Sequence, residues 1–304
     1  MDRIDAMKML LTTVETGSFS AAGRALRVPV QTVSRNVADL ERYIGTQLLT
    51  RSTRKISLTD AGATYVASVK NILEQIADAE RIAAGEFVEP RGDLVLSAPE
   101  LFGRRYVLPI VTEFLKIYSE INVRLILSDR NLDLIDEQID MVVRIGHLPD
   151  SGMVAIGVGS VRAVVCGSPE YLASHGVPQT PQDLIQMPCI STNDINLTSD
   201  WRFVDAHKGY PIELPLAFRL KTSAAALVDA AVDGIGLARL LHYQAFDALE
   251  SGELSLVLTD YELPAFPVHL LHAAYSPMPL KMRRFLDFAS PRLREALAHF
   301  TRKG

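Results

Sequence analysis

The sequence predicts a protein of mixed α/β class, in which a small, mostly helical amino-terminal module precedes a larger body of alternating strands and helices. With 304 residues, of which 48% are hydrophobic, the chain is long enough for two or three globular domains. Residues 1–60 hold nine Lys/Arg and six Asp/Glu, whereas the whole chain carries a net charge of -5. These observations indicate a small basic module on a larger acidic body.

Composition also restricts where the protein can work. No apolar run approaches the ~18–20 residues that span a bilayer, so no membrane partner is expected. The amino-terminal stretch MDRIDAMKML lacks the architecture of a signal peptide. Cys166 and Cys189 stand apart without metal-ligand spacing, which predicts buried free thiols. We therefore expect a cytoplasmic protein.

Two short helices are predicted at the start of the chain. The first places its apolar side chains at helical spacing on one face, at Ile4, Met7, Leu11 and Val14. Gly17 interrupts this helix. Either Ser18 or Ser20 can then cap a second helix, because a serine oxygen accepts a hydrogen bond from a free N–H of the first turn.

The stretch RVPVQTVSRNVADLE, residues 27–41, predicts a third helix. Pro29 suits its first turn, where the missing N–H would have no partner anyway, and Gly45 can end it. One face is apolar, at Val33, Val37, Leu40 and Ile44. The opposite face is short or polar, at Gln31, Arg35, Ala38 and Arg42. From the pattern alone, this face either meets solvent or lies on a flat, negatively charged partner.

The segment that follows alternates over residues 47–59 and turns at 52–54, which predicts a small hairpin or wing. Two helices joined by a tight connector, the second exposing a small polar face, are typical of a helix-turn-helix. The amino-terminal module therefore has the pattern of a helix-turn-helix followed by a wing.

A long helix is predicted from Thr59 or Asp60, and its apolar seam consists of Val66, Val69, Leu73 and Ile76. Because nothing before this segment is large enough to cover four turns of seam, we expect a partner helix and hence a dimer. The alternative is that the helix packs on its own domain. Residues 85–92, GEFVEPRG, are predicted to be a linker.

Beyond the linker, strands and helices alternate. The first series predicts strands at 93–98, 123–128 and 140–146 and helices at 100–118 and 131–139. The second series predicts strands at 153–159, 161–168, 215–220, 234–240 and 268–275 and helices at 169–176, 223–234 and 280–300. Repeated strand–helix–strand order predicts two small parallel sheets, with ligands bound near the carboxyl ends of the strands.

Residues 14–62 closely resemble the amino-terminal signature of LysR-type transcriptional regulators. The resemblance lies in GSFSAA, in TVSR at the start of the third helix, in LE followed by IG, in LLTRSTR and in LTDAG. The strings SAPELFGRRYVLP, DMVVRIG, VVCGSPEYLASHG and GIGLA extend it more loosely through the body.

This resemblance implies three parts. Residues 1–59 would form a winged helix-turn-helix, residues 60–91 a linker and dimerisation helix with a hinge, and residues 92–304 an effector-binding domain like a periplasmic binding protein. In that domain, subdomain I would take about 92–161 and 268–304, and subdomain II about 162–267. Such regulators usually assemble as tetramers and bind interrupted inverted repeats in double-stranded DNA. They can also contact RNA polymerase.

The resemblance also gives the polar face of the third helix a role. Its short side chains let the helix enter the major groove, where Gln31 and Arg35 can reach base edges and Val30 can contact a thymine methyl group. Arg51 and Arg54 of the wing would hold the phosphate backbone. The full set of expected DNA-binding residues is Ser18, Ser20, Val30, Gln31, Thr32, Ser34, Arg35, Arg51 and Arg54.

The expected sensor site is the cleft of the carboxy-terminal domain. It comprises Ser97, Pro99, Glu100, Ser128, Arg144, Thr192, Thr222 and Ser223. Strand ends and helix starts could present N–H groups there, although simple helix capping is the alternative for each Ser and Thr. Glu100 disfavours a strongly anionic ligand, because a second carboxylate nearby would be repelled. We therefore expect a small, mostly organic effector.

Catalysis has little support, and no catalytic residue, metal or cofactor is expected. The seven histidines all lie in the body, and His269 and His272 should point to opposite faces of one strand. No nucleophile elbow, P-loop or complete dinucleotide fingerprint occurs. Two alternatives to a ligand-responsive regulator stay open. One is a small-molecule-binding α/β protein whose amino-terminal helices only mediate assembly, and the other is a DNA-binding protein that has lost ligand sensing.

Overall fold

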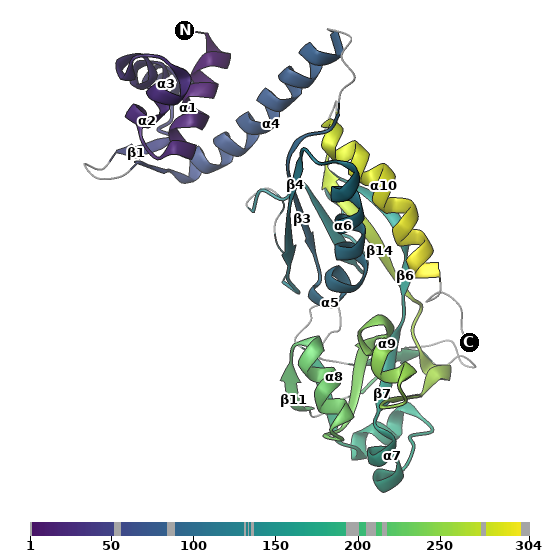
Figure 1. The fold of residues 1–304 in the computed structure, drawn as a ribbon. Helices are drawn as coiled ribbons and strands as arrows, with labels where there is room; N and C mark the ends of the chain where they lie inside the picture. The colour runs from purple at the N-terminus through teal and green to yellow at the C-terminus, as the bar shows by residue number, and fades with distance from the viewer. Residues whose placement is uncertain are drawn as a thin grey trace. The chain divides into compact units, whose positions relative to one another are not determined.

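The computed structural model describes residues 2–51, 56–83, 89–130, 132, 134, 137–192, 201–204, 211–214, 218–274 and 278–298. These residues form two compact units (Figure 1), the first made largely of residues 1–90 and the second of most of residues 91–304. No helix in the described ranges is both long and apolar enough to cross a membrane.

The amino-terminal unit contains the predicted helices and wing. Its elements are α1 (Arg3–Thr16), α2 (Phe19–Leu26), α3 (Val30–Ile44), β1 (Leu49–Arg51), β2 (Ile56–Leu58) and α4 (Asp60–Ala83). β1 and β2 pair antiparallel, which confirms a hairpin, although its predicted turn at 52–54 lies outside the described residues. The core lies between α1 and α3, where Ala6, Leu10, Val37, Leu40 and Leu48 are buried.

Local chemistry sets the ends of these helices. The Ser18 hydroxyl accepts a hydrogen bond from Ala21 N at 3.1 Å, so Ser18 rather than Ser20 is the N-cap of α2. Pro29 is the N-cap of α3, one residue ahead of the helix that it was predicted to open. Gly45 ends α3 with φ 78°, a left-handed conformation that glycine adopts without strain.

The predicted buried face of α1 is wrong at Ile4, which is 38% exposed. The buried positions are instead Ala6, Leu10 and Thr13. The Thr13 hydroxyl donates to Met9 O at 2.7 Å, so its polar atom is satisfied within the helix. Small side chains at Ala6 and Thr13 let α1 approach its neighbours closely, and a count of large apolar residues overlooks such positions.

The first half of α4 packs on its own module. Thr59 Oγ1 accepts from Gly62 N at 2.9 Å and donates to Gln47 O at 2.8 Å, which ties the start of the helix to the wing. Val66 and Val69 are 9% and 0% exposed within the single chain. The premise that nothing in the chain covers the predicted dimer seam is therefore wrong at Val66 and Val69. Leu73 and Ile76 are only half-buried.

The second unit contains two five-stranded sheets. The first has the order β4-β3-β5-β14-β6. Its strands are β3 (Gly92–Ala98), β4 (Ile121–Leu127), β5 (Met141–Ile145), β6 (Met153–Val161) and β14 (Phe266–Ala273). A helical segment follows β3 as α5 (Glu100–Phe102), a π-helical turn η1 (Gly103–Val107) and α6 (Leu108–Ile117). Phe114 of α6 meets Phe285 of α10 (Leu280–Leu297) edge to face, at 5.2 Å between ring centroids.

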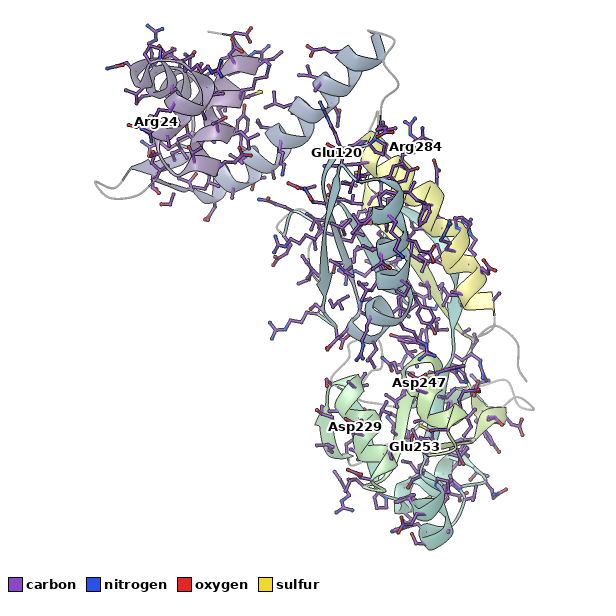
Figure 2. All side chains as sticks on the ribbon, in the orientation of Figure 1. Arg24, Glu120, Asp229, Asp247, Glu253 and Arg284 are labelled. Carbon is purple, nitrogen blue, oxygen red and sulfur yellow. The ribbon has the colours of Figure 1, made fainter. Side chains whose placement is uncertain are left out.

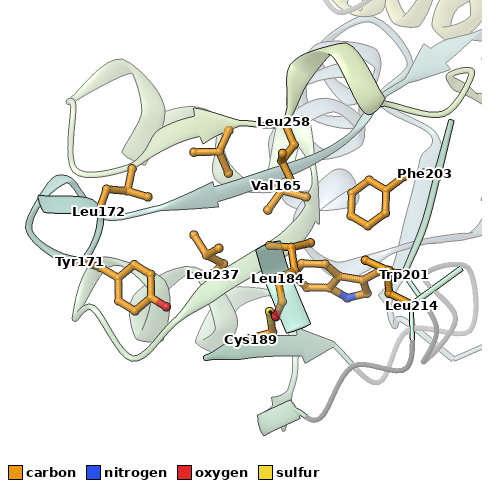
Figure 3. Packing of buried hydrophobic residues seen from close by; sticks show 11 residues of the cluster. Val165, Tyr171, Leu172, Leu184, Cys189, Trp201, Phe203, Leu214, Leu237 and Leu258 are labelled. Carbon is orange, nitrogen blue, oxygen red and sulfur yellow. Dashed lines mark hydrogen bonds between the residues drawn. The ribbon is translucent and has the colours of Figure 1, made fainter. Parts of the chain in front are cut away.

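The second sheet has the order β11-β8-β12-β7-β13. Its strands are β7 (Ala163–Gly167), β8 (Cys189–Thr192), β11 (Phe218–Thr222), β12 (Leu237–Leu241) and β13 (Ser255–Val257). The helices are α7 (Pro169–His175), α8 (Ala224–Val232) and α9 (His242–Glu250), with 3-10 turns η2 (Pro181–Gln186) and η3 (Thr259–Tyr261). The short hairpin β9 (Arg202–Val204) and β10 (Pro211–Glu213) adds an aromatic layer, in which Trp201 and Phe203 pack over one face of this sheet (Figure 3).

The predicted class is confirmed, since a helical module is joined to two α/β sheets, but several details differ. The sheets are mixed rather than parallel, because β14 runs antiparallel to β5 and β6, and β7 antiparallel to β12. β8 and α9 were not predicted. The described residues of the predicted helix at 131–139 form turns, because Gln138 has φ 53° and Ile139 N closes a turn onto Leu134 O. Residues 85–88 of the predicted linker lie outside the described ranges.

Candidate nucleic-acid interface and effector site

The exposed face of α3 starts directly after a very tight connector. Arg27 ends α2 in a left-handed conformation, φ 57°, and Val28 N donates back to Gly23 O at 3.0 Å. A Cβ at Gly23 would lie 2.9 Å from Val28 O, so only glycine allows α2 and α3 to approach this closely. This close approach fixes the first turn of α3 at the surface of the module.

Side chains on that first turn are short, and the cations are exposed. Val30 is 36% exposed and Gln31 and Arg35 are exposed, while Thr32 and Ser34 are half-buried. The first turn of α3 holds no acidic residue. Arg42, two turns further along α3 than Arg35, is already paired with Asp39 at 2.7 Å. Among the described residues Arg35 has no ion pair, so its guanidinium keeps its donors for a partner.

Other cations and polar groups border this face. Arg24, labelled in Figure 2, and Arg27 are exposed on and after α2. Ser20 is exposed on the first turn of α2, and Ser18 is half-buried with its oxygen used as the cap. The side chains of Arg51 and Arg54 lie outside the described residues, so their predicted contacts with phosphate stay predictions.

Glu41 holds the wing against α3, a role that the sequence analysis missed. Its carboxylate accepts hydrogen bonds from Leu48 N at 2.9 Å and Leu49 N at 3.0 Å. The wing itself is joined across its strands by Thr50 Oγ1 and Ser57 Oγ at 2.8 Å. The glutamate belongs to the pair LE that was noted in the sequence. Its hydrogen bonds reach residues seven and eight positions ahead, and the spacing of apolar residues does not reveal such bonds.

The first half of the predicted effector site comes together at the carboxyl ends of β3, β4 and β5. Ser97, Pro99, Ser128 and Arg144 line one hollow there. Its volume is about 20 Å³, which is room for roughly one water molecule. In this conformation the hollow is too small to enclose a metabolite.

A carboxylate of the chain already occupies the start of α5. Asp129 Oδ1 accepts from Glu100 N at 2.9 Å, and Asp129 lines the hollow while the Glu100 side chain is exposed. Arg144 lines the same hollow and donates to Leu132 O. Asp129 was missed because it belongs to no strand or helix pattern. Its charge strengthens the argument against a strongly anionic effector at this helix start.

The second half of the site is a separate cluster in the second sheet. Thr192 and Thr222 are register partners at the carboxyl ends of the parallel strands β8 and β11. Ser223 is the N-cap of α8, accepting from Ala226 N at 3.5 Å, as the capping alternative expected. Neither threonine lines the hollow that contains Ser97. The structure thus groups the predicted residues into two clusters rather than one.

A contact between α5–η1 and α9 joins the two sheets' subdomains. Both carboxylate oxygens of Asp247, labelled in Figure 2, accept from Arg105 Nη1 at 2.7 Å. The Arg105 guanidinium also lies 4.5 Å from the Phe246 ring centroid. Beside it, Phe102 meets Tyr243 edge to face at 5.4 Å. Sequence analysis missed this contact because α9 was not predicted.

The two cysteines of the body are buried and poorly suited to act as nucleophiles. Cys166 and Cys189 are buried free thiols, as predicted, and burial raises the pKa of each to about 12, which disfavours the nucleophilic thiolate. In the described ranges no group of three His, Cys, Asp or Glu side chains could hold a metal ion.

Family models match both units of the chain. The model of the LysR substrate binding domain matches residues 88–294, and that of the bacterial regulatory helix-turn-helix protein of the lysR family matches residues 4–63. The chain belongs to the LysR family of transcriptional regulators. The LysR helix-turn-helix match covers α1 to the start of α4, and the substrate-binding match covers both sheets.

Known LysR-family proteins resemble this chain over nearly its whole length. The probable HTH-type transcriptional regulator LtrA of Klebsiella pneumoniae is 33% identical over 287 residues, 93% of each chain. The structure of CrgA, a LysR-type transcriptional regulator from Neisseria meningitidis, is 29% identical with a TM-score of 0.61, covering 95% of this chain and 98% of CrgA. Full-length AphB, a Vibrio cholerae virulence activator, is 26% identical with a TM-score of 0.60, covering 94% and 97%.

Proposed function

We propose that this LysR-type regulator binds promoter DNA by placing the first turns of α3 in the major groove. The observation that carries the proposal is the exposed start of α3. There the side chains are short, no acidic residue is present, and Arg35 has no ion pair among the described residues. A duplex offers two phosphate ridges around a groove wide enough for one helix, and such a face fits between them.

Each residue of this surface has a proposed task. Gln31 and Arg35 are long enough to hydrogen-bond base edges, and Val30 offers an apolar contact to a thymine methyl group. The short side chains of Thr32 and Ser34 leave room for this approach. Their hydroxyl groups, like those of Ser18 and Ser20, can donate hydrogen bonds to the phosphate backbone of the DNA. Arg51 and Arg54 of the wing hold phosphates, a sequence-independent contribution that weakens with salt.

Assembly is proposed to occur through the second half of α4. Val66 and Val69 are already covered within one chain, which leaves Leu73 and Ile76, both half-buried, as the members of the predicted seam that are available to a partner helix. A homodimer would pair two α3 helices with an inverted repeat, and two dimers would form the tetramer. The resulting complex would act in the cytoplasm, where RNA polymerase is its possible partner.

The proposed effector is a small, mostly uncharged organic metabolite. Asp129 and Glu100 disfavour a strong anion, whereas Ser97, Thr192 and Thr222 offer hydroxyl donors and acceptors. Binding requires the hollow beside Ser97 to open toward the threonines of β8 and β11. An effector that prefers the open arrangement shifts the equilibrium between subdomain arrangements and so changes the spacing of the DNA-binding units.

A gel shift with the DNA upstream of the protein's own gene tests the proposal. We expect full-length protein to retard this fragment in the presence of excess scrambled competitor. Arg35→Ala should lose the preference, whereas Arg284→Ala, which removes an exposed arginine from α10, should keep it. Equal retardation of upstream and scrambled DNA by the unaltered protein would instead favour the alternative, in which the helices only mediate assembly.

A further inference from the structure

The wing of the amino-terminal module is hydrogen-bonded to α3 at its base, residues 47–49, which lead from α3 into β1. The Glu41 carboxylate of α3 accepts hydrogen bonds from Leu48 N at 2.9 Å and from Leu49 N at 3.0 Å, both at Oε1. Leu48 is 1% exposed and Glu41 is half-buried, so these bonds are partly shielded from water. The end of α3 thereby fixes the point at which the wing begins.

Thr59, directly before α4, holds the base of the wing from the other side. Its Oγ1 donates to Gln47 O at 2.8 Å, and its N–H donates to Leu48 O at 3.0 Å. The same Oγ1 accepts from Gly62 N at 2.9 Å, and a Cβ at Gly62 would overlap the Leu48 carbonyl oxygen. The base of the wing therefore lies between the end of α3 and the first turn of α4, with hydrogen bonds on both sides.

The strands of the wing are too short to fix its orientation by themselves. β1 and β2 have three residues each, and an isolated two-stranded hairpin is marginally stable. Leu49 and Leu58 pack in the core of the module, but apolar packing is non-directional. The Thr50 Oγ1 and Ser57 Oγ atoms, 2.8 Å apart, join one strand to the other. The hydrogen bonds at the base of the wing add the direction that this packing lacks.

Glu41 has the wrong charge for a helix that is proposed to enter DNA. Phosphates repel a nearby carboxylate, and the first turn of α3 holds no acidic residue. If Glu41 acted only through its charge, its removal would strengthen DNA binding. Its hydrogen bonds to Leu48 and Leu49 predict the opposite, because without them the wing can leave the position in which it meets the DNA backbone. The sign of the effect therefore separates the two roles.

We propose that Glu41 is a positioning residue for DNA binding, which together with Thr59 holds the wing where Arg51 and Arg54 reach the phosphates. The inference rests on the proposed function, specifically on the phosphate contacts of these two arginines, whose side chains lie outside the described residues. Glu41 contacts no DNA in this arrangement and acts through the wing. Its role depends neither on base reading by Arg35 nor on the effector.

The salt dependence of DNA binding by the full-length protein tests this role. Fluorescence anisotropy on upstream and random duplexes, over a series of salt concentrations, gives the affinity and the slope of its logarithm against the logarithm of salt concentration. For Glu41→Ala we expect weaker binding to both duplexes and a slope shallower by about one to two units, because each lost phosphate contact removes roughly 0.9. Glu41→Gln keeps an acceptor oxygen and should keep the slope. Glu15→Ala, which removes an exposed carboxylate from α1, should bind no more weakly than the unaltered protein.

A background that lacks both wing arginines separates positioning from a general loss of fold. Arg51→Ala/Arg54→Ala should itself have the shallower slope, and adding Glu41→Ala should cause no further loss of slope or affinity, whereas a module that failed to fold would lose more.

The positioning role is overturned if Glu41→Ala alone binds more tightly or keeps the slope of the unaltered protein. A further loss in the background without the two arginines also overturns it, as does an unchanged slope in that background itself. Failure of base reading is a separate outcome, since it appears as equal binding of upstream and random duplexes by the unaltered protein, whereas the slopes are measured on both.

Discussion

The proposed DNA-binding face of α3 and the proposed effector site are built in opposite ways. The face on α3 comes from one contiguous helix, its connector and one glutamate, and it is complete at the surface of a single module. The effector residues come from strand ends spread from Ser97 to Ser223, and they form two clusters with room for about one water molecule. The proposed DNA-binding face needs no rearrangement, whereas the proposed effector site must open to admit a ligand. In the proposed function, this difference separates a reading element from a sensing element in one chain.

The largest expected effect comes from a substitution that destabilises only the amino-terminal module. A Cβ at Gly62 would overlap the Leu48 carbonyl oxygen, which is backbone and cannot move cheaply. We predict that Gly62→Ala destabilises the amino-terminal module by ~3 kcal/mol, as overpacking of a tight contact does. Gly152→Ala is the matched control, because a Cβ there meets nothing within 4 Å. Thermal unfolding should show an early transition for Gly62→Ala only, and a single unshifted transition would contradict the packing described at the start of α4.

The next effect concerns the base-reading role of Arg35. Arg35→Ala should weaken binding to upstream DNA by ~1–3 kcal/mol if the guanidinium contacts a guanine. Because Arg35 is exposed and unpaired among the described residues, the melting temperature should stay unchanged. Fluorescence anisotropy on upstream and random duplexes separates the possibilities. A loss of the same size on both duplexes would make Arg35 a phosphate contact.

A smaller effect probes whether the two sensing clusters act together. Ser97→Ala and Thr222→Ala should each weaken effector binding by ~0.5–1.5 kcal/mol, the usual contribution of one hydrogen bond. Titration calorimetry against a panel of small metabolites measures this, with Ser174→Ala on α7 as an exposed control. Undiminished binding in both variants would place the effector elsewhere and remove the need for the hollow to open.

The smallest effect is a pH dependence confined to the body, where all seven histidines lie. Burial lowers the pKa of His269, with a smaller contribution from His147, and burial also lowers the pKa of His242. A folded-state pKa below the unfolded value means that the unfolded state binds protons more tightly. Stability is therefore full at pH values above the unfolded pKa of about 6.5 and falls as the pH drops below it.

Chemical denaturation at pH 7.5 and pH 5.5 measures this effect. The transition of the body should move to lower denaturant at pH 5.5, and His269→Asn should reduce the movement. Equal movement in the variant would show that other groups carry the pH dependence.

The contrast between the two regions also explains what the sequence could reveal. The start and end of α3 and its buried Val33, Val37 and Leu40 follow from the spacing of contiguous residues. Ile4 was misplaced because periodicity favours large side chains over Ala6 and Thr13, which allow close packing. β8 is only four residues long and gives little pattern of its own.

The effector region depends on pairings that are distant in the sequence. Antiparallel β14 joins residues more than a hundred positions apart, which alternating strands and helices alone do not reveal. Asp129 and Asp247 owe their significance to neighbours in other elements. Their residue types are visible in the sequence, but their partners are a property of the fold.

The most direct measurement of the central claim, that the first turns of α3 lie in the major groove, is a thermodynamic cycle on bound DNA. Single guanines of the upstream site are replaced by 7-deazaguanine, which removes the major-groove N7 acceptor, and binding of the unaltered protein and of Arg35→Ala is compared. The account predicts that at one guanine in each half-site the replacement weakens the unaltered protein but leaves Arg35→Ala unaffected. Equal penalties for both proteins at every guanine would contradict it.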